Sequence, residues 1–198
     1  GFALALWVMG TSLAIPIARL RARQAIPGAV LGMVIAHFGI GLSTLGITGV
    51  QSFKIEQDVA LAVGEAASVG GYDFRLMSLK DVQGPNFIAV EGEVAVSRDG
   101  RPVATLHPQK RLYNSGGNPM TEAGIEVSAA RDLFAALGED LGQGRWSLRL
   151  QYKPLIRYIW LGALLIALGG GIAALDRRYR RVTAAQPAGG TVAAGASR

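Results

Sequence analysis

The sequence predicts a membrane protein with three transmembrane α-helices and a small all-β domain inserted between the second and third helices. Half of the 198 residues are apolar, and 17% are charged, below the roughly 25% of an ordinary soluble protein. Three uncharged stretches approach the ~20 residues that a helix needs to cross a bilayer. The long polar segment between the last two alternates apolar and polar residues, as half-buried strands do.

The predicted transmembrane helices are 1–18, 27–50 and 155–175. The first has no basic segment before it, and arginines follow it instead. This is the opposite of the charge order of a secretory signal peptide. We therefore expect a transmembrane helix that is truncated at its N-terminus, in a chain that is the C-terminal piece of a longer or split membrane protein.

The distribution of charge predicts how the chain is oriented. Residues 51–153 contain 13 acidic and 11 basic residues, whereas the rest of the chain contains nine arginines and one aspartate. Because basic residues mark the cytoplasmic side, we expect 19–26 to be a cytoplasmic loop. The tail 176–198 is expected there too, disordered after about residue 187. The domain at 51–154 then lies in the periplasm, and its slight negative charge excludes nucleic acid as a partner.

The periplasmic domain is predicted to be a closed or nearly closed barrel, similar to an OB fold, because six short strands occur in about 100 residues. Asp99-Gly100 after one strand is typical of a hairpin turn. Arg131–Leu137 is predicted as a short helix ended by Gly138. The predicted strands are Phe53–Val59, Tyr72–Leu79, Phe87–Arg98, Pro102–Tyr113, Gly124–Val127 and Trp146–Tyr152.

Composition excludes several kinds of site in this chain. The absence of cysteine excludes disulfides, Cys-ligated zinc, iron–sulfur clusters and thiol chemistry. No phosphate loop or catalytic motif is present. Glu91 and Glu93 share a strand face, which we interpret as a solvated face rather than an acid–base pair. Of the two histidines, His107 is expected at the surface.

His37 is the candidate functional residue, because it lies about 15 Å into the second predicted span, near the middle of a ~30 Å apolar core. An ionisable side chain at that depth is a functional hypothesis by default. Haem ligation, a structural hydrogen bond, and proton or quinone chemistry all fit it. On a helical wheel, small residues occupy one face: Gly28, Gly32, Ala36, Gly39, Ser43 and Gly46. The opposite face holds His37, Met33, Gly41, Thr44 and Thr48, and Gly41 is expected to leave room beside the ring.

Several motifs together resemble the C-terminal part of the CcmF family of bacterial cytochrome c-type biogenesis proteins, to which the nitrite-reductase assembly subunit NrfE is related. The resemblance covers about residues 28–181. The motifs are Leu106-His107-Pro108-Gln109-Lys110-Arg111-Leu112-Tyr113, Pro119-Met120-Thr121-Glu122-Ala123, Arg131-Asp132-Leu133-Phe134-Ala135-Ala136-Leu137-Gly138-Glu139, Trp146-Ser147-Leu148-Arg149-Leu150-Gln151-Tyr152-Lys153-Pro154 and Asp176-Arg177-Arg178-Tyr179-Arg180.

The resemblance implies a haem lyase subunit in the bacterial inner membrane. Such proteins receive haem from the periplasmic chaperone CcmE and help attach it to apocytochrome c, working with the thiol partner CcmH. They also hold a haem b between two transmembrane histidines. By its position before the outer domain, His37 matches the second of these, so the resemblance implies that His37 is an axial ligand of the haem iron.

The resemblance also implies limits. The family's tryptophan-rich segment and its other functional histidines have no counterpart in this sequence, so the chain is not expected to catalyse haem attachment alone. Quinol is the expected source of electrons. Thr44 and Thr48 are candidate partners that would orient the His37 ring. The alternative is a membrane-anchored periplasmic scaffold that binds partners and has no cofactor.

Overall fold

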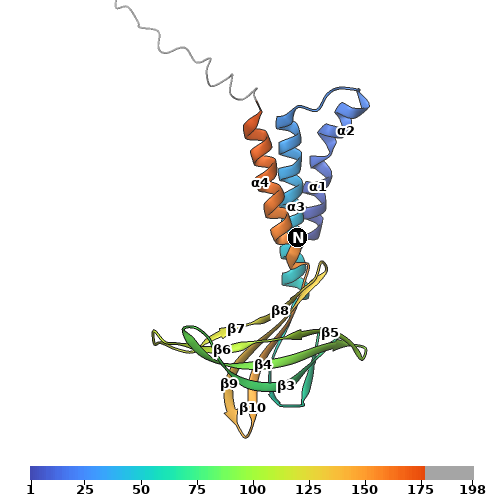
Figure 1. Cartoon of the computed structure of the whole chain (residues 1–198). Coiled ribbons are helices and arrows are strands. Elements are labelled where there is room, and N and C mark those ends of the chain that lie inside the picture. The colour runs from blue at the N-terminus through green and yellow to red at the C-terminus, as the bar shows by residue number, and fades with distance from the viewer. Residues whose placement is uncertain (177–198) are drawn as a thin grey trace, which may run out of the picture.

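The computed structural model describes residues 1–176, in which a bundle of helices stands on a domain made of strands (Figure 1). In that part of the chain, three helical segments are long and apolar enough to cross a membrane: Phe2–Arg21, Gly28–Phe53 and Ile156–Leu175. The predicted fold class, three spans with a small all-β domain, is therefore confirmed. The prediction of a disordered end to the tail falls outside the described residues.

The first span consists of two helices, α1 (Phe2–Ser12) and α2 (Ala14–Arg21). Pro16 accounts for the interruption, because proline has no backbone N–H and its ring clashes with the carbonyl four residues earlier, at the end of α1. The single helix predicted at 1–18 is thus two helices, which continue three residues further.

The second and third spans, α3 (Gly28–Phe53) and α4 (Ile156–Leu175), pack against each other through glycines. A Cβ atom added to Gly39 would lie 2.6 Å from the carbonyl oxygen of Gly162, so no larger residue fits between the helices there. The small-residue face predicted from the wheel is therefore the face toward α4. The same close approach occurs at Gly32 against Gly169 and at Gly46 against Ile159.

Between α3 and α4, the described chain forms ten strands in two antiparallel sheets. One sheet has the order β1-β10-β9-β8 and the other β2-β3-β4-β6-β7, with β5 paired to β4. The strands are β1 (Ile55–Ala62), β2 (Ala66–Val69), β3 (Tyr72–Gln83), β4 (Phe87–Arg98), β5 (Arg101–Leu106), β6 (Gln109–Tyr113), β7 (Met120–Glu122), β8 (Gly124–Val127), β9 (Arg131–Gly142) and β10 (Arg145–Pro154). The all-β prediction holds. The predicted single barrel of six strands is in fact a curled sandwich.

Within the six-stranded sheet, β4 changes partners along its length. Its first half, Phe87–Glu91, pairs with β6, whereas its second half, Val94–Arg98, pairs with β5. The predicted alternation of β4 is confirmed, since Val94 and Val96 are fully buried in the core. Gly92 belongs to the same inner face, where it lies against the side chains of Leu76 and Leu137.

The helix predicted at Arg131–Leu137 is wrong, because these residues belong to strand β9. The Ala-Ala-Leu-Gly run favours a helix locally, but Leu133, Ala135 and Leu137 are fully buried in the sandwich core. That spacing has the period of a strand. Pairing with β8 and β10 therefore overrides local helix propensity.

An ion pair joins the β-sandwich to the membrane helices. Arg157, in the first turn of α4, donates to both carboxylate oxygens of Asp132 in β9, at 3.2 and 3.0 Å. At the other junction, α3 runs to Phe53, three residues past the predicted end of the span. The first strand consequently begins at Ile55 rather than Phe53.

Candidate functional site

His37 lies at the tenth position of the 26-residue helix α3, on the side that faces away from α4. Its side chain is exposed in the described chain, as are those of Ile40 and Ile47 along the same helix. Hydrocarbon cannot hydrogen bond to an imidazole at this depth. The ring must therefore find its polar partners within protein or in a bound group.

One hydrogen bond fixes the orientation of the ring. His37 Nδ1 lies 2.8 Å from the carbonyl oxygen of Met33, one turn earlier in α3. A carbonyl can only accept a hydrogen bond, so Nδ1 carries a proton, and in the neutral ring Nε2 then keeps its lone pair. This is the neutral tautomer that binds a metal through Nε2, with the usual carbonyl partner behind it.

The threonines considered as orienting partners do not have that role. Thr44 Oγ1 donates to the Ile40 carbonyl at 2.9 Å, within its own helix. Thr48 lies beside Gly1, at the start of α1. Among the described residues, the Met33 carbonyl is the hydrogen-bond partner of His37.

The prediction that Gly41 leaves space beside the His37 ring is also wrong. A Cβ atom at Gly41 would lie 2.3 Å from Met9 Cγ and 3.0 Å from the carbonyl oxygen of Ala5, both in α1. Gly41 therefore provides the close contact between α1 and α3. Its missing side chain makes room for Met9, so α3 packs against α1 here and against α4 through its glycine face.

The donor set limits which group this site fits. Within residues 1–176, no three His, Asp or Glu side chains cluster closely enough to hold a metal ion. A lone imidazole does suit a metal whose equatorial ligands come from a macrocycle, as in haem proteins with a histidine ligand. The apolar surroundings, the fixed tautomer and the free Nε2 fit haem on this side of α3.

His107 has a different environment, in the connection between β5 and β6. Its Nδ1 lies 3.5 Å from Glu91 Oε1, and its side chain is half exposed. Glu91 also pairs with the Lys80 ammonium, 2.9 Å away, and accepts a hydrogen bond from Gln109. The Lys80 ammonium has the largest effect among these partners, which together hold the pKa of the Glu91 carboxyl below its ordinary value. His107 thus belongs to a polar surface network, and Glu91 is a structural carboxylate rather than half of an acid–base pair.

The fold and the site define a class of protein: a helical membrane protein with a β-sandwich outside the bilayer. The model of the CcmF C-terminal beta-sandwich matches residues 52–154, which include all ten strands. The chain belongs to the CcmF family of cytochrome c-type biogenesis proteins. The resemblance seen in the sequence motifs is confirmed.

Individual relatives agree with this assignment. The chain is 46% identical over 149 residues to CcmF of Pseudomonas aeruginosa, covering 75% of this chain and 23% of that protein. It is 39% identical over 181 residues to CcmF of Escherichia coli, covering 91% and 28%. A solved structure, "Cytochrome c Heme Lyase CcmF", shares the fold with a TM-score of 0.74 at 24% identity, covering 87% of this chain and 29% of that one. The chain spans about a quarter of the length of these relatives.

Sequence reasoning found His37 but missed the Met33 carbonyl. The spacing of four residues would have indicated it, since side chains on a helix can bond to the carbonyl one turn earlier. Residue patterns alone could not show that the His37 ring is oriented with Nδ1 toward the Met33 carbonyl.

Proposed function

We propose that this chain is the C-terminal part of a haem lyase subunit, in which His37 is an axial ligand of a haem b within the bacterial inner membrane. The observation that carries the proposal is the His37–Met33 hydrogen bond, which in the neutral ring leaves the lone pair on Nε2, on a side chain that is exposed in the described chain. Haem coordination is the use of that lone pair that best fits the apolar surroundings.

Each residue of the site has a distinct part in this proposal. His37 would hold the haem iron through the lone pair of Nε2, while the Met33 carbonyl keeps the proton on Nδ1. The hydrogen bond to the Met33 carbonyl would also raise the basicity of the ligating nitrogen. When bound, haem b supplies one-electron redox chemistry, with quinol as the source of electrons. His37 would provide one ligand to this group, and it is the one histidine in the described helices α1 to α4.

The outer domain is proposed to work in the periplasm with other maturation proteins. Membership of the CcmF family supports the haem chaperone CcmE, a CcmH-type thiol partner and apocytochrome c as its partners. The absence of cysteine in this chain is consistent with the thiol chemistry residing in those partners. The charge distribution supports the orientation, since the arginines of α2 lie at the opposite end of the bundle from the β-sandwich (Figure 1).

An optical experiment tests the haem ligand. The intact, full-length protein that contains this chain is purified, and reduced-minus-oxidised b-haem spectra are recorded for wild type, His37→Ala and Thr44→Val. We expect His37→Ala to lose the b-haem band or shift it strongly, because one axial ligand is gone. Thr44→Val is the matched control, since it removes a polar side chain about two turns away in the same helix, whose hydroxyl donates to the Ile40 carbonyl within α3.

A second measurement separates ligation from a structural role. Free imidazole added to His37→Ala should restore much of the low-spin spectrum, because it replaces the missing ligand without restoring any packing. Haem content and spectrum that stay unchanged in His37→Ala would refute the proposal. They would favour the alternative, a membrane-anchored scaffold without its own cofactor.

A further inference from the structure

Strand β3 has a free edge along its second half. β2 pairs with the first four residues of β3, Tyr72–Arg75, whereas β4 accompanies β3 as far as Gln83. In the described part of the chain, no strand pairs with the other side of 77–83. Unpaired edge strands are templates for the addition of another strand.

Two backbone hydrogen bonds show which groups face this open edge. The Gly92 N–H bonds to the Pro108 carbonyl at 2.9 Å and so points away from β3. In an antiparallel pair, directly opposite residues point their backbone groups the same way, both toward or both away from each other. Leu79, which lies opposite Gly92, therefore directs its own N–H and carbonyl toward the free edge.

The hairpin turn gives the same register independently. The Gly84 N–H bonds to the Phe87 carbonyl at 2.8 Å, so the next pair inward, Gln83 and Ile88, is not hydrogen bonded. The alternation then places Leu79, Asp81 and Gln83 in one set. Each of these three residues presents an N–H and a carbonyl to the open edge.

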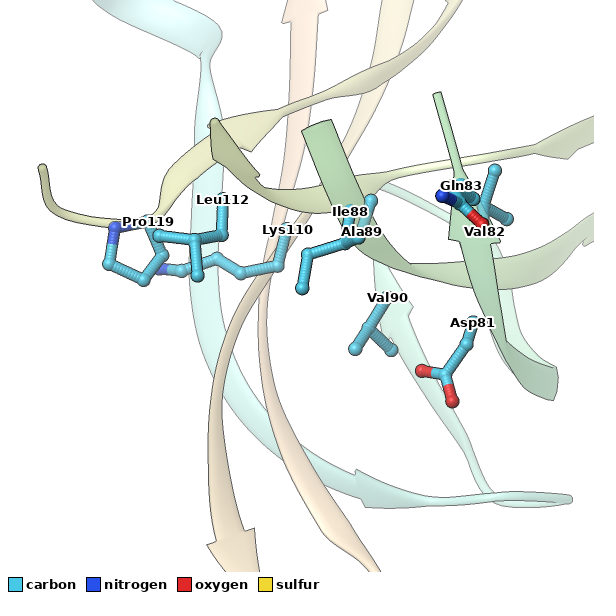
Figure 2. A pocket seen from close by; sticks show the side chains of 9 residues that line it. All are labelled: Asp81, Val82, Gln83, Ile88, Ala89, Val90, Lys110, Leu112 and Pro119. Carbon is cyan, nitrogen blue, oxygen red and sulfur yellow. The ribbon is translucent and has the colours of Figure 1, made fainter. Parts of the chain in front are cut away.

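Asp81 and Gln83 line an open hollow of about 640 Å³, whereas Leu79, in the same set, packs against the core. Apolar side chains of β4 and β6 form its floor, among them Ile88, which is 55% exposed, and Leu112, which is 40% exposed. Figure 2 shows Asp81 and Val90 next to each other, with Lys110, Leu112 and Pro119 across the hollow.

Charge distinguishes the two ends of the hollow. The Lys110 ammonium is already paired with Glu139 Oε1 at 2.7 Å. Asp81 is exposed and forms no hydrogen bond or ion pair with any residue in 1–176. The hollow therefore has one carboxylate whose charge is uncompensated, directly beside the free edge.

We propose that the free edge of β3 binds an extended segment of a partner polypeptide as an added antiparallel strand. Its alternate residues face the hollow: a Lys or Arg lies opposite Asp81, and long apolar side chains beside it extend over β3 toward Ile88. Backbone bonds to Leu79, Asp81 and Gln83 supply affinity, and the hollow supplies specificity, as in other strand-addition complexes. This inference stands apart from the haem ligand, because it involves no residue of the transmembrane helices.

Peptide binding to the whole chain in lipid nanodiscs tests the proposal. The probe is a fluorescein-labelled peptide in which Leu, Lys and Leu alternate with Thr. The side chains of Leu and Lys face the hollow, and the backbone groups of the same residues point toward β3. We expect saturable binding. Methylating the backbone nitrogens of the Leu and Lys residues should weaken it more than about tenfold, since these N–H groups bond to β3. Methylating the Thr nitrogens, which face solvent, should change it by less than about threefold.

A pair of protein variants tests the charge. Asp81→Asn should weaken binding about three- to fivefold, the effect of one partly exposed ion pair. Asp99→Asn is the matched control, because it neutralises a 91% exposed carboxylate at the β4–β5 turn, remote from the edge. A probe with Glu in place of Lys should bind Asp81→Lys more tightly than wild type.

Three results would overturn the proposal. One is the absence of binding up to about 1 mM, the weak end of specific recognition. Another is equal binding by the two methylated peptides, or equal affinities for Asp81→Asn and Asp99→Asn. The third is a dimer of the chain that the peptide dissociates, because it would assign the edge to a second copy.

Discussion

At the residue scale, single polar contacts decide what two otherwise similar side chains do. The two histidines both have a hydrogen-bonding or ionic partner at Nδ1, yet their environments differ. His37 bonds to a backbone carbonyl in an apolar span, which leaves a basic nitrogen for a metal. His107 lies near the carboxylate of Glu91 at a polar surface, where it contributes to a charge network.

The Glu91 network has a pH-dependent consequence. The Lys80 ammonium lowers the pKa of the Glu91 carboxyl in the folded protein, so the folded state favours the ionised form. A carboxyl with a depressed pKa stabilises the fold above its unfolded pKa, about 4.3, and loses that contribution as pH falls through the folded value.

We therefore expect Glu91→Gln to lower the free energy of unfolding by about 0.5–1 kcal/mol at neutral pH, the upper range for such pairs. The difference from wild type should shrink once the pH falls below about 4. Thermal unfolding of the purified chain, followed by the circular dichroism of the strands at several pH values, measures this. Glu93→Gln is the control, since Glu93 accepts a bond from Ser78 and forms no ion pair within the described residues. A difference in the free energy of unfolding between wild type and Glu91→Gln that stays constant down to pH 3 would contradict the expectation.

At the element scale, packing decides between competing local tendencies. The residues of β9 combine a helix-favouring Ala-Ala-Leu run with a strand period, and the pairing with β8 and β10 selects the strand. In the membrane, glycine normally disfavours a helix. Gly39 and Gly162 nevertheless lie inside α3 and α4, because only glycine permits their backbones to approach so closely.

This contrast gives opposite expectations for the same substitution at two glycines. Gly39→Ala places a Cβ atom 2.6 Å from the Gly162 carbonyl oxygen and should destabilise the helix pair by about 1–3 kcal/mol. Gly170→Ala in α4 meets no atom within 4 Å, so improved helix propensity should make it neutral or stabilising by up to about 1 kcal/mol. Thermal unfolding in detergent compares the two. If both variants shift stability in the same direction by the same amount, the glycine contact does not hold α3 against α4.

At the scale of the whole molecule, the β-sandwich is an insertion in a helical hairpin. The end of α3 and the start of α4 are adjacent, since Gly49 lies against the side chain of Leu155. The chain leaves α3, forms both sheets and returns beside its starting point, where Arg157 and Asp132 fix the domain to α4. An odd number of spans separates the arginines of α2 from the sandwich.

Topology reporters check this arrangement in cells. A fusion after Arg23 should report the cytoplasm, and an insertion at the Gly100 turn should report the periplasm, because α3 lies between the two positions. The Gly100 turn is exposed, so an insertion there is expected to be tolerated. Reporters on the same side would refute a membrane-crossing α3.

The sequence by itself determined the three apolar spans and the all-β character of the outer domain, and it singled out His37 as the candidate ligand, which stays a prediction. These depend on composition, alternation and depth along one helix, which are local properties of the chain. Its glycine stripe also predicted the side of α3 on which a neighbouring helix packs.

Only the tertiary structure decided what depends on partners distant in sequence. It made β9 a strand, filled the space beside Gly41 with the side chain of Met9 and divided the strands between two sheets. It also left the edge of β3 unpaired beside an apolar hollow. The reason is that neither the pairing of strands nor the packing of helices is encoded in one segment: each is selected by the competition among all segments for buried contacts.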